Sequence, residues 1–89
     1  IALTRTAARE LGPHGVTANV VAPGFIGTET LRGILKPVVL EKLREQIPLG
    51  RIGEASEVGR VVAFLASEAA SYLNGAVVDI TGGRLEYAL

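Results

Sequence analysis

The sequence predicts an α/β fold, specifically the carboxyl-terminal part of a doubly wound parallel sheet with helices on both faces. Helical and strand-like segments alternate along the chain, which is typical of parallel α/β folds. Residues 16–22 are almost all β-branched or small, as in a strand covered on both faces. Two short strands and their crossover do not make a stable sheet alone. We therefore expect the 89 residues to be an incomplete part of one domain, without an internal boundary.

The first helix is expected over residues 1–11, because Leu3, Ala7 and Leu11 recur on one helical face. The Gly12-Pro13 pair then ends it. Ile1 is not a start Met, and no Ser, Thr, Asp or Asn cap precedes this helix. These features favour the interpretation that the chain is a fragment of a longer protein.

A strand is expected at 16–22, followed by a loop at 25–37 with one helical turn at 31–35 and by a short helix at 38–47. A turn-rich connection at 48–53 leads to a longer helix at 54–67. Residues 69–75 are expected to be irregular, and a second strand follows at 76–80. The helix over 54–67 has the clearest period, because apolar residues recur at Val58, Val61 and Leu65.

Composition excludes several classes of function. Nine basic and nine acidic residues cancel, so the chain lacks the positive charge typical of proteins that bind nucleic acid or anionic membranes. No cysteine is present for a disulfide, a thiolate metal site or a thiol nucleophile. No apolar run approaches the roughly 20 residues that span a bilayer. We expect no nucleic-acid, membrane or metal partner, and a cytoplasmic location.

The candidate site follows the first strand. Pro23 and Gly24 end this strand, and Thr28 follows closely. Ligands of open α/β sheets bind just beyond the carboxyl ends of the strands, where backbone groups and a hydroxyl would be available. The alternative is that Pro-Gly only ends the strand and that Thr28 caps the next helix.

Three other polar residues are expected to have no catalytic role. Asn19 is expected to bond the backbone within a buried strand. His14 lies in a turn and is expected to be solvated, with no catalytic or metal role. Arg51 is interpreted as a solvated turn charge, the alternative being a carboxylate partner.

Four segments resemble, in the same order, the short-chain dehydrogenase/reductase family. They are the helix at 3–11, the strand and Pro-Gly turn at 15–24, the Pro-Leu-Gly-Arg-Ile-Gly run at 48–53 with Glu57-Val58 after it, and 64–75 before the Gly82-Gly83 pair. The ordered set covers nearly the whole chain and is far more specific than any one segment. Within the family, the chain most resembles the bacterial reductases of 3-oxoacyl-carrier-protein thioesters. Gly27, Asn74 and Thr81 depart from the residues common at those positions.

The resemblance implies a Rossmann-like, three-layer α/β/α fold and hydride transfer between a nicotinamide and a carbonyl or alcohol carbon. A Tyr acts as acid or base in the family, and a Lys four residues later lowers the pKa of that Tyr. Neither Tyr72 nor Tyr87 is followed by such a Lys, and Gly82-Gly83 does not open a helix as a phosphate-binding loop does. No catalytic residue is assigned, and we expect the 89 residues to be inactive alone.

The resemblance also implies roles for the loop after the first strand. Pro23 fixes the turn and Gly24 permits close approach of the nicotinamide ring. The backbone of Ile26 and the hydroxyl of Thr28 meet the carboxamide. A mobile substrate lid would be formed by the helix at 38–47 with Phe25, Leu31 and Leu35. The alternative for that helix is a surface helix packing its own apolar stripe.

The parent protein is thus expected to reduce a carbonyl of a small substrate, with a 3-oxoacyl thioester favoured. NADP(H) is the favoured cofactor, with NAD(H) possible, and a homotetramer or homodimer is the implied assembly. One alternative is a family member that oxidises an alcohol, sugar or steroid. Another, of a different class, is a non-catalytic α/β interaction module.

Overall fold

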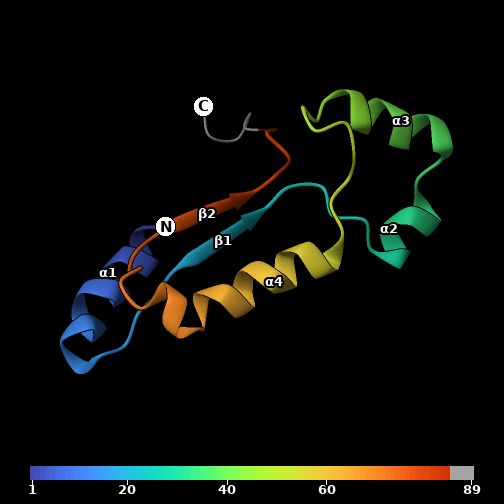
Figure 1. Ribbon diagram of the computed structural model, residues 1–89. Helices are drawn as coiled ribbons and strands as arrows, with labels where there is room; N and C mark the ends of the chain where they lie inside the picture. The colour runs from blue at the N-terminus through green and yellow to red at the C-terminus, as the bar shows by residue number, and fades with distance from the viewer. Residues whose placement is uncertain (85–89) are drawn as a thin grey trace. The chain divides into compact units, whose positions relative to one another are not determined.

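The computed structural model describes residues 1–84, without the side chains of Thr30 and Leu31. The elements in chain order are α1 (Ala2–Leu11), a 3-10 turn (Gly12–His14), β1 (Val20–Pro23), α2 (Glu29–Ile34), α3 (Pro37–Glu45), α4 (Ala55–Leu65), a second 3-10 turn (Glu68–Ala70) and β2 (Val77–Ile80) (Figure 1). This alternation of helices and strands confirms the predicted α/β class.

The two strands pair as neighbours in a two-stranded sheet and run in the same direction (Figure 1). The N–H of Val20 donates to the carbonyl of Ala76 at 2.9 Å, and the N–H of Gly24 donates to that of Ile80 at 2.9 Å. Both strands therefore advance together along the ladder, as parallel strands do.

The chain divides into two compact units. The first unit contains residues 1–22 and 59–79, and the second contains 23–58 and the residues from 80 onward. In the first unit the most buried side chains are Ala8 and Ala70. In the second they are Ile47 and Ile52, so each unit has a small aliphatic core.

Two asparagine side chains bond the backbone of the first unit. The Asn74 amide donates to the carbonyl of Ala8 at 3.0 Å, and its oxygen accepts from the N–H of Ala18 at 3.0 Å. The oxygen of Asn19 accepts from the N–H of Ala76 at 3.0 Å, and its amide donates to the carbonyl of Leu73 at 3.3 Å. The expectation that Asn19 bonds the backbone is confirmed.

The first strand begins at Val20, later than the predicted start at residue 16. Before Val20, the Ala18 N–H is bonded by the Asn74 side chain, and the Ala18 carbonyl accepts from the N–H of Gly75 at 2.8 Å. A side chain and a turn thus bond the backbone groups of Ala18 that a neighbouring strand would otherwise bond. The β-branched residues at positions 16–17 favour a strand, but they do not indicate that other groups bond the backbone here.

Helix boundaries differ from the predictions by a few residues. The single turn expected at 31–35 is a six-residue helix that begins at Glu29. α3 begins at Pro37, where proline suits the first helical turn, and ends two residues early because the N–H of Ile47 bonds the carbonyl of Arg44. α4 is shorter than the predicted helix at 54–67. Glu54 lies just before its first turn, where the N–H of Glu54 donates to the Glu57 carboxylate at 2.9 Å and caps the start of the helix.

Gly82 packs against the core of the second unit. Its φ of 64° lies in the left-handed region, and a Cβ built there would lie 2.7 Å from Cγ2 of Ile47. The carbonyl of Gly82 also accepts from the N–H of Leu49 at 3.1 Å. Backbone conformation and space therefore both require glycine at this position.

Two kinds of feature are absent from residues 1–84. None of the helices there combines the length and apolarity needed to cross a bilayer. No group of three or more His, Cys, Asp or Glu side chains in residues 1–84 is placed to hold a metal ion.

Replacing Asn74 with alanine should destabilise the protein by about 1–3 kcal/mol, because the Ala8 carbonyl and the Ala18 N–H would both lose their partner. The measurement is urea-induced unfolding followed by circular dichroism. Ser71→Ala, an exposed change in the same connection, is the control and should stay within about 0.5 kcal/mol. Equal unfolding midpoints for Asn74→Ala and the wild type would contradict the bridging role.

Candidate functional site

The loop at residues 23–28, within the second unit, is held by backbone bonds on two sides. The N–H of Gly24 donates to the Ile80 carbonyl at 2.9 Å and so extends the ladder beyond β1. Gly53 donates to the carbonyl of Phe25 at 3.0 Å and accepts from the N–H of Gly27 at 2.8 Å. These two bonds make an isolated parallel bridge between Ile26 and Gly53.

The bridge directs the peptide groups of Ile26 away from Gly53. Both bonds use the flanking residues, Phe25 and Gly27, so the N–H and carbonyl of Ile26 face the opposite edge. The carbonyl of Ile26 accepts from the N–H of Thr28 at 3.0 Å. Within residues 1–84 no acceptor bonds the N–H of Ile26. The loop therefore presents a backbone donor, a group that proteins normally satisfy.

Position 24 requires glycine because there is no space for a side chain. A Cβ at this position would lie 3.1 Å from Cα and 3.3 Å from Cβ of Thr81. Its φ is not positive, so crowding and not a left-handed conformation excludes a side chain. The sequence predicted close approach of a ligand at Gly24, whereas the close neighbour that the structure describes is Thr81. Pro23 lies at the exposed end of β1, directly before this contact.

Phe25 packs against the guanidinium of Arg84, a contact that the sequence did not predict. The guanidinium of Arg84 lies 4.6 Å from the centre of the Phe25 ring. The same guanidinium donates to the side-chain oxygen of Gln46, just after α3, at 3.1 Å. Arg84 thereby connects the loop to the end of α3. No sequence pattern relates positions as distant as 25 and 84, so this contact was not predictable.

Thr28 occupies the N-cap position of α2, because its carbonyl accepts from the N–H of Arg32 at 3.0 Å. This placement agrees with the capping interpretation and leaves the nicotinamide interpretation as a prediction. Leu35 is half-buried just after α2. The side chain of Leu31 lies outside the described residues.

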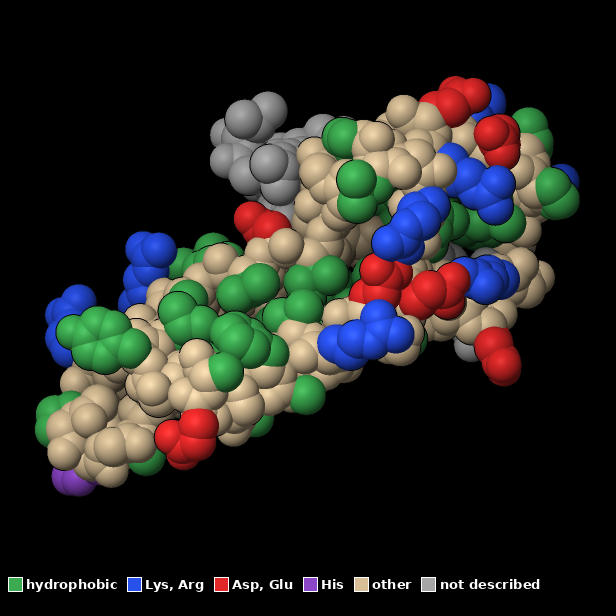
Figure 2. Space-filling view, viewed as in Figure 1, with side chains coloured by type: hydrophobic (Ala, Val, Ile, Leu, Met, Phe, Trp, Pro, Cys, Tyr) green, Lys and Arg blue, Asp and Glu red, His purple; other side chains and the backbone are tan. Residues whose placement is uncertain are grey.

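A network of charged side chains lies before and at the start of α4. Glu57 accepts from both terminal nitrogens of Arg51, at 2.7 and 2.9 Å. Arg32 of α2 bonds Glu54 at 2.7 Å. In Figure 2 acidic and basic side chains intermingle where Figure 1 places α2, α3 and the start of α4. The alternative of a carboxylate partner for Arg51 is confirmed, because Glu57 accepts two hydrogen bonds from it, while the Arg51 side chain stays exposed as expected of a solvated turn charge.

The contact with Glu57 also affects ionisation. Its hydrogen bond and negative charge hold the pKa of Arg51 above the ordinary arginine value. A raised pKa of a base stabilises the fold at all pH values below the unfolded-state pKa, and this contribution is lost only as pH rises through the folded-state pKa. The raised pKa of Arg51 therefore contributes no pH dependence near neutrality.

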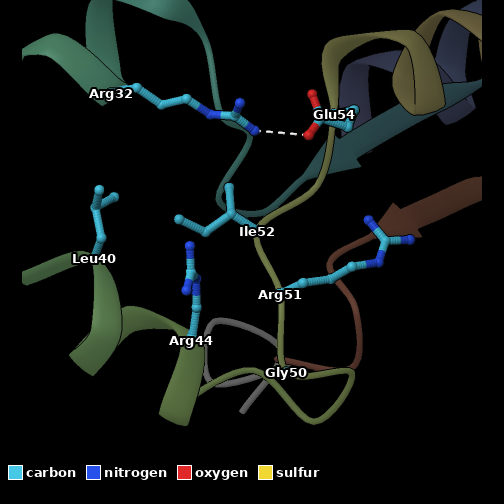
Figure 3. Close-up of a pocket in the computed structure, with 7 residues that line it drawn as sticks. All are labelled: Arg32, Leu40, Arg44, Gly50, Arg51, Ile52 and Glu54. Carbon is cyan, nitrogen blue, oxygen red and sulfur yellow. Dashed lines mark hydrogen bonds and ion pairs between the residues drawn. The ribbon is translucent and has the colours of Figure 1, made fainter. Parts of the chain in front are cut away.

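A cavity of about 460 Å³ adjoins this network within the second unit (Figure 3). Its lining residues are Arg32, Leu40, Arg44, Gly50, Arg51, Ile52 and Glu54. The sequence did not predict this cavity, because its arginines come from three separate segments. None of those segments forms a basic run that would have drawn attention.

Comparison with known proteins identifies the family. Residues 1–84 match the family model described as "Enoyl-(Acyl carrier protein) reductase". The chain belongs to this family of short-chain dehydrogenases/reductases. The resemblance stated from four sequence segments is thereby confirmed, and it includes similarity to the 3-oxoacyl-carrier-protein reductases.

Curated short-chain dehydrogenases/reductases are similar along nearly all of the chain. The human (3R)-3-hydroxyacyl-CoA dehydrogenase is 51% identical over 83 residues, which are 93% of this chain and 31% of that protein. The 3-oxoacyl-(acyl-carrier-protein) reductase FabG of Pseudomonas aeruginosa is 51% identical over 80 residues, 90% of this chain and 32% of the relative. Acetoacetyl-CoA reductase of Shinella zoogloeoides is 40% identical over 84 residues, 94% and 35% of the two chains. The chain thus spans about a third of the length of these relatives.

Alanine at Gly24 and alanine at Gly33 should change stability in opposite directions. Gly24→Ala forces a methyl group against the Thr81 backbone and should cost about 1–3 kcal/mol. Gly33 lies within α2 with no atom near its missing Cβ, so Gly33→Ala should stabilise by about 0.5–1 kcal/mol. Thermal unfolding of both variants checks this. An unchanged melting temperature for Gly24→Ala would contradict the crowding.

Proposed function

We propose that the chain is the carboxyl-terminal portion of an NAD(P)(H)-dependent oxidoreductase that reduces the carbonyl of a 3-oxoacyl thioester. Family membership supports nicotinamide chemistry. The similar proteins include a 3-oxoacyl-carrier-protein reductase, an acetoacetyl-CoA reductase and a 3-hydroxyacyl-CoA dehydrogenase. Each name joins a C3 oxygen function to a thioester carrier, so this substrate class is favoured over free alcohols, sugars and steroids.

The proposed fold of the parent protein is a Rossmann-like, doubly wound, three-layer sheet in a single domain. β1 and β2 would be its last strands, with the dinucleotide-binding and catalytic Tyr and Lys residues contributed by other parts of the protein. The parallel pairing of β1 with β2 supports this arrangement. A homotetramer or homodimer in the cytoplasm, with NADP(H) favoured over NAD(H), completes the proposal.

In this proposal the loop at 23–28 orients the nicotinamide, which supplies the transferred hydride when bound. The carboxamide of that ring has both an acceptor oxygen and a donor amide, so it needs partners of both kinds. The N–H of Ile26, with no acceptor in residues 1–84, is the observation that carries this role, because it would donate to the carboxamide oxygen. The hydroxyl of Thr28 would be the second partner, while Pro23 and Gly24 hold the loop against β2.

The lid is proposed to comprise α2, which contains Leu31, together with α3, Phe25 and Leu35. Exposed apolar side chains on these helices, including Ile34 and Val38, support a surface that an acyl chain would cover. The exposed Arg32–Glu54 pair joins α2 to the residues before α4 and would limit how far the lid opens.

The direct test is oxidation of NADPH or NADH by the full protein that carries this chain, with acetoacetyl-CoA as substrate. Thioester-dependent oxidation of either dinucleotide is expected. Activity confined to free alcohols, sugars or steroids would favour the alternative dehydrogenase. Failure to bind either dinucleotide would favour the non-catalytic interaction module.

Thr28→Val should raise the dissociation constant for the dinucleotide about tenfold, because one hydrogen bond to the carboxamide is lost. Thr28→Ser keeps a hydroxyl and should bind within about twofold of the wild type. Fluorescence titration of NADPH measures both. Because Thr28 also occupies the cap of α2, thermal unfolding is recorded for each variant. Wild-type affinity in a folded Thr28→Val protein would contradict the assignment.

A further inference from the structure

The cavity beside α2 and α3 brings guanidinium groups and aliphatic side chains together. Figure 3 shows Arg32 and Arg44 on either side of Ile52, with Arg44 directed toward Ile52 and Arg51 directed away from it. Leu40 completes the apolar part of the lining. The cavity thus combines a cationic part with a small aliphatic wall.

The guanidinium of Arg44 is weakly engaged in the described structure. Its ion pair is with Glu41 on the same helix, at 3.3 Å, and both side chains are more than half exposed. Such surface pairs contribute about 0–0.5 kcal/mol and exchange readily with another anion. Arg44 therefore has donors that a ligand in the cavity would engage at little cost.

Arg32 offers further donors. It bonds a single oxygen of Glu54 through one nitrogen, Nη2, at 2.7 Å. A guanidinium carries five N–H donors, so this contact leaves room for a second acceptor on the same group. By contrast, both terminal nitrogens of Arg51 donate to Glu57, so Arg51 contributes mainly the aliphatic part of its side chain to the cavity lining.

The unused N–H donors of the cavity favour an anion. Three arginines and one carboxylate line the cavity, and Glu41 and Glu57, which pair with Arg44 and Arg51, balance the remaining charge. An anion is therefore favoured by the donors of Arg32 and Arg44 that these pairs leave available and not by an excess of positive charge. Guanidinium groups form planar, two-point contacts with phosphate and carboxylate oxygens. A terminal phosphate offers three such oxygens and a phosphodiester offers two, so either kind has an oxygen for each of Arg32 and Arg44.

We propose that this cavity binds a phosphate group of the thioester carrier, an inference that rests on the proposed function. The phosphate comes from coenzyme A or from the phosphopantetheine arm of an acyl carrier protein, which share phosphate-ester chemistry. Arg44 and Arg32 bind the phosphate oxygens, and Leu40 and Ile52 contact the adjoining aliphatic part of the carrier. Neither arginine takes part in hydride transfer.

The test compares acetoacetyl-CoA with acetoacetyl-pantetheine, which lacks phosphate, in the full protein. The wild type should show a lower KM for the phosphate-bearing substrate, and Arg44→Gln should reduce that preference about tenfold. Arg44→Lys keeps the charge but loses the two-point geometry, so it should recover part of the preference. Arg60→Gln, an exposed arginine of α4 outside the cavity lining, is the matched control and should behave as wild type.

Two more substrates identify the source of the phosphate. If the 3′-phosphate of coenzyme A is bound, the effect of Arg44→Gln disappears with the 3′-dephospho-CoA thioester. If the phosphate next to pantetheine is bound, the effect persists with that thioester and with the acyl-carrier-protein thioester. An equal preference in wild type and Arg44→Gln for every carrier would overturn the proposal.

Failure of the proposed function is distinguishable from failure of this site. If no thioester is reduced, the proposed activity is wrong, and calorimetric titration with adenosine 3′,5′-bisphosphate and with inorganic pyrophosphate still reports on the cavity. Binding that Arg44→Gln weakens and Arg60→Gln does not would support the site. Absence of binding of both probes to the wild type would overturn it.

Discussion

The pairing of the loop at 23–28 with Gly53 on one side and with Ile80 on the other is the constraint on which the second unit depends. Parallel bonds of this kind fix which peptide groups face inward and which face out. They leave the N–H of Ile26 directed away from Gly53 and bring Gly24 against Thr81. The candidate site is therefore a property of backbone pairing more than of any reactive side chain.

The charged network performs a related function at the start of α4. Glu57 receives both the Arg51 guanidinium and the N–H of Glu54, so one carboxylate fixes a turn and begins a helix. Glu54 in turn holds Arg32 of α2. Charge pairs at the surface add little free energy individually. Their contribution here is to define the direction in which the connection enters α4 and the position of α2 within the second unit.

Periodicity and turn residues predicted the order and type of the elements, because the helix at 55–65 and both strands have strong local signals. The start of β1 was not predictable, since the Asn74 side chain replaces strand pairing at Ala18 from far along the chain. The same limit applies to the site. Pro23, Gly24 and Thr28 carry local signals, whereas the Arg84–Phe25 contact and the arginine-lined cavity depend on tertiary placement.

The dependence of the loop on Gly53, Ile80 and Thr81 has a consequence for biosynthesis. During translation residues 23–28 emerge well before Ile80, and contacts between segments distant in sequence form only when both are available. The loop therefore reaches its final conformation only after β2 and the residues beyond it have left the ribosome. A nascent chain stalled before Ile80 would lack the ordered loop, however complete the rest of its fold.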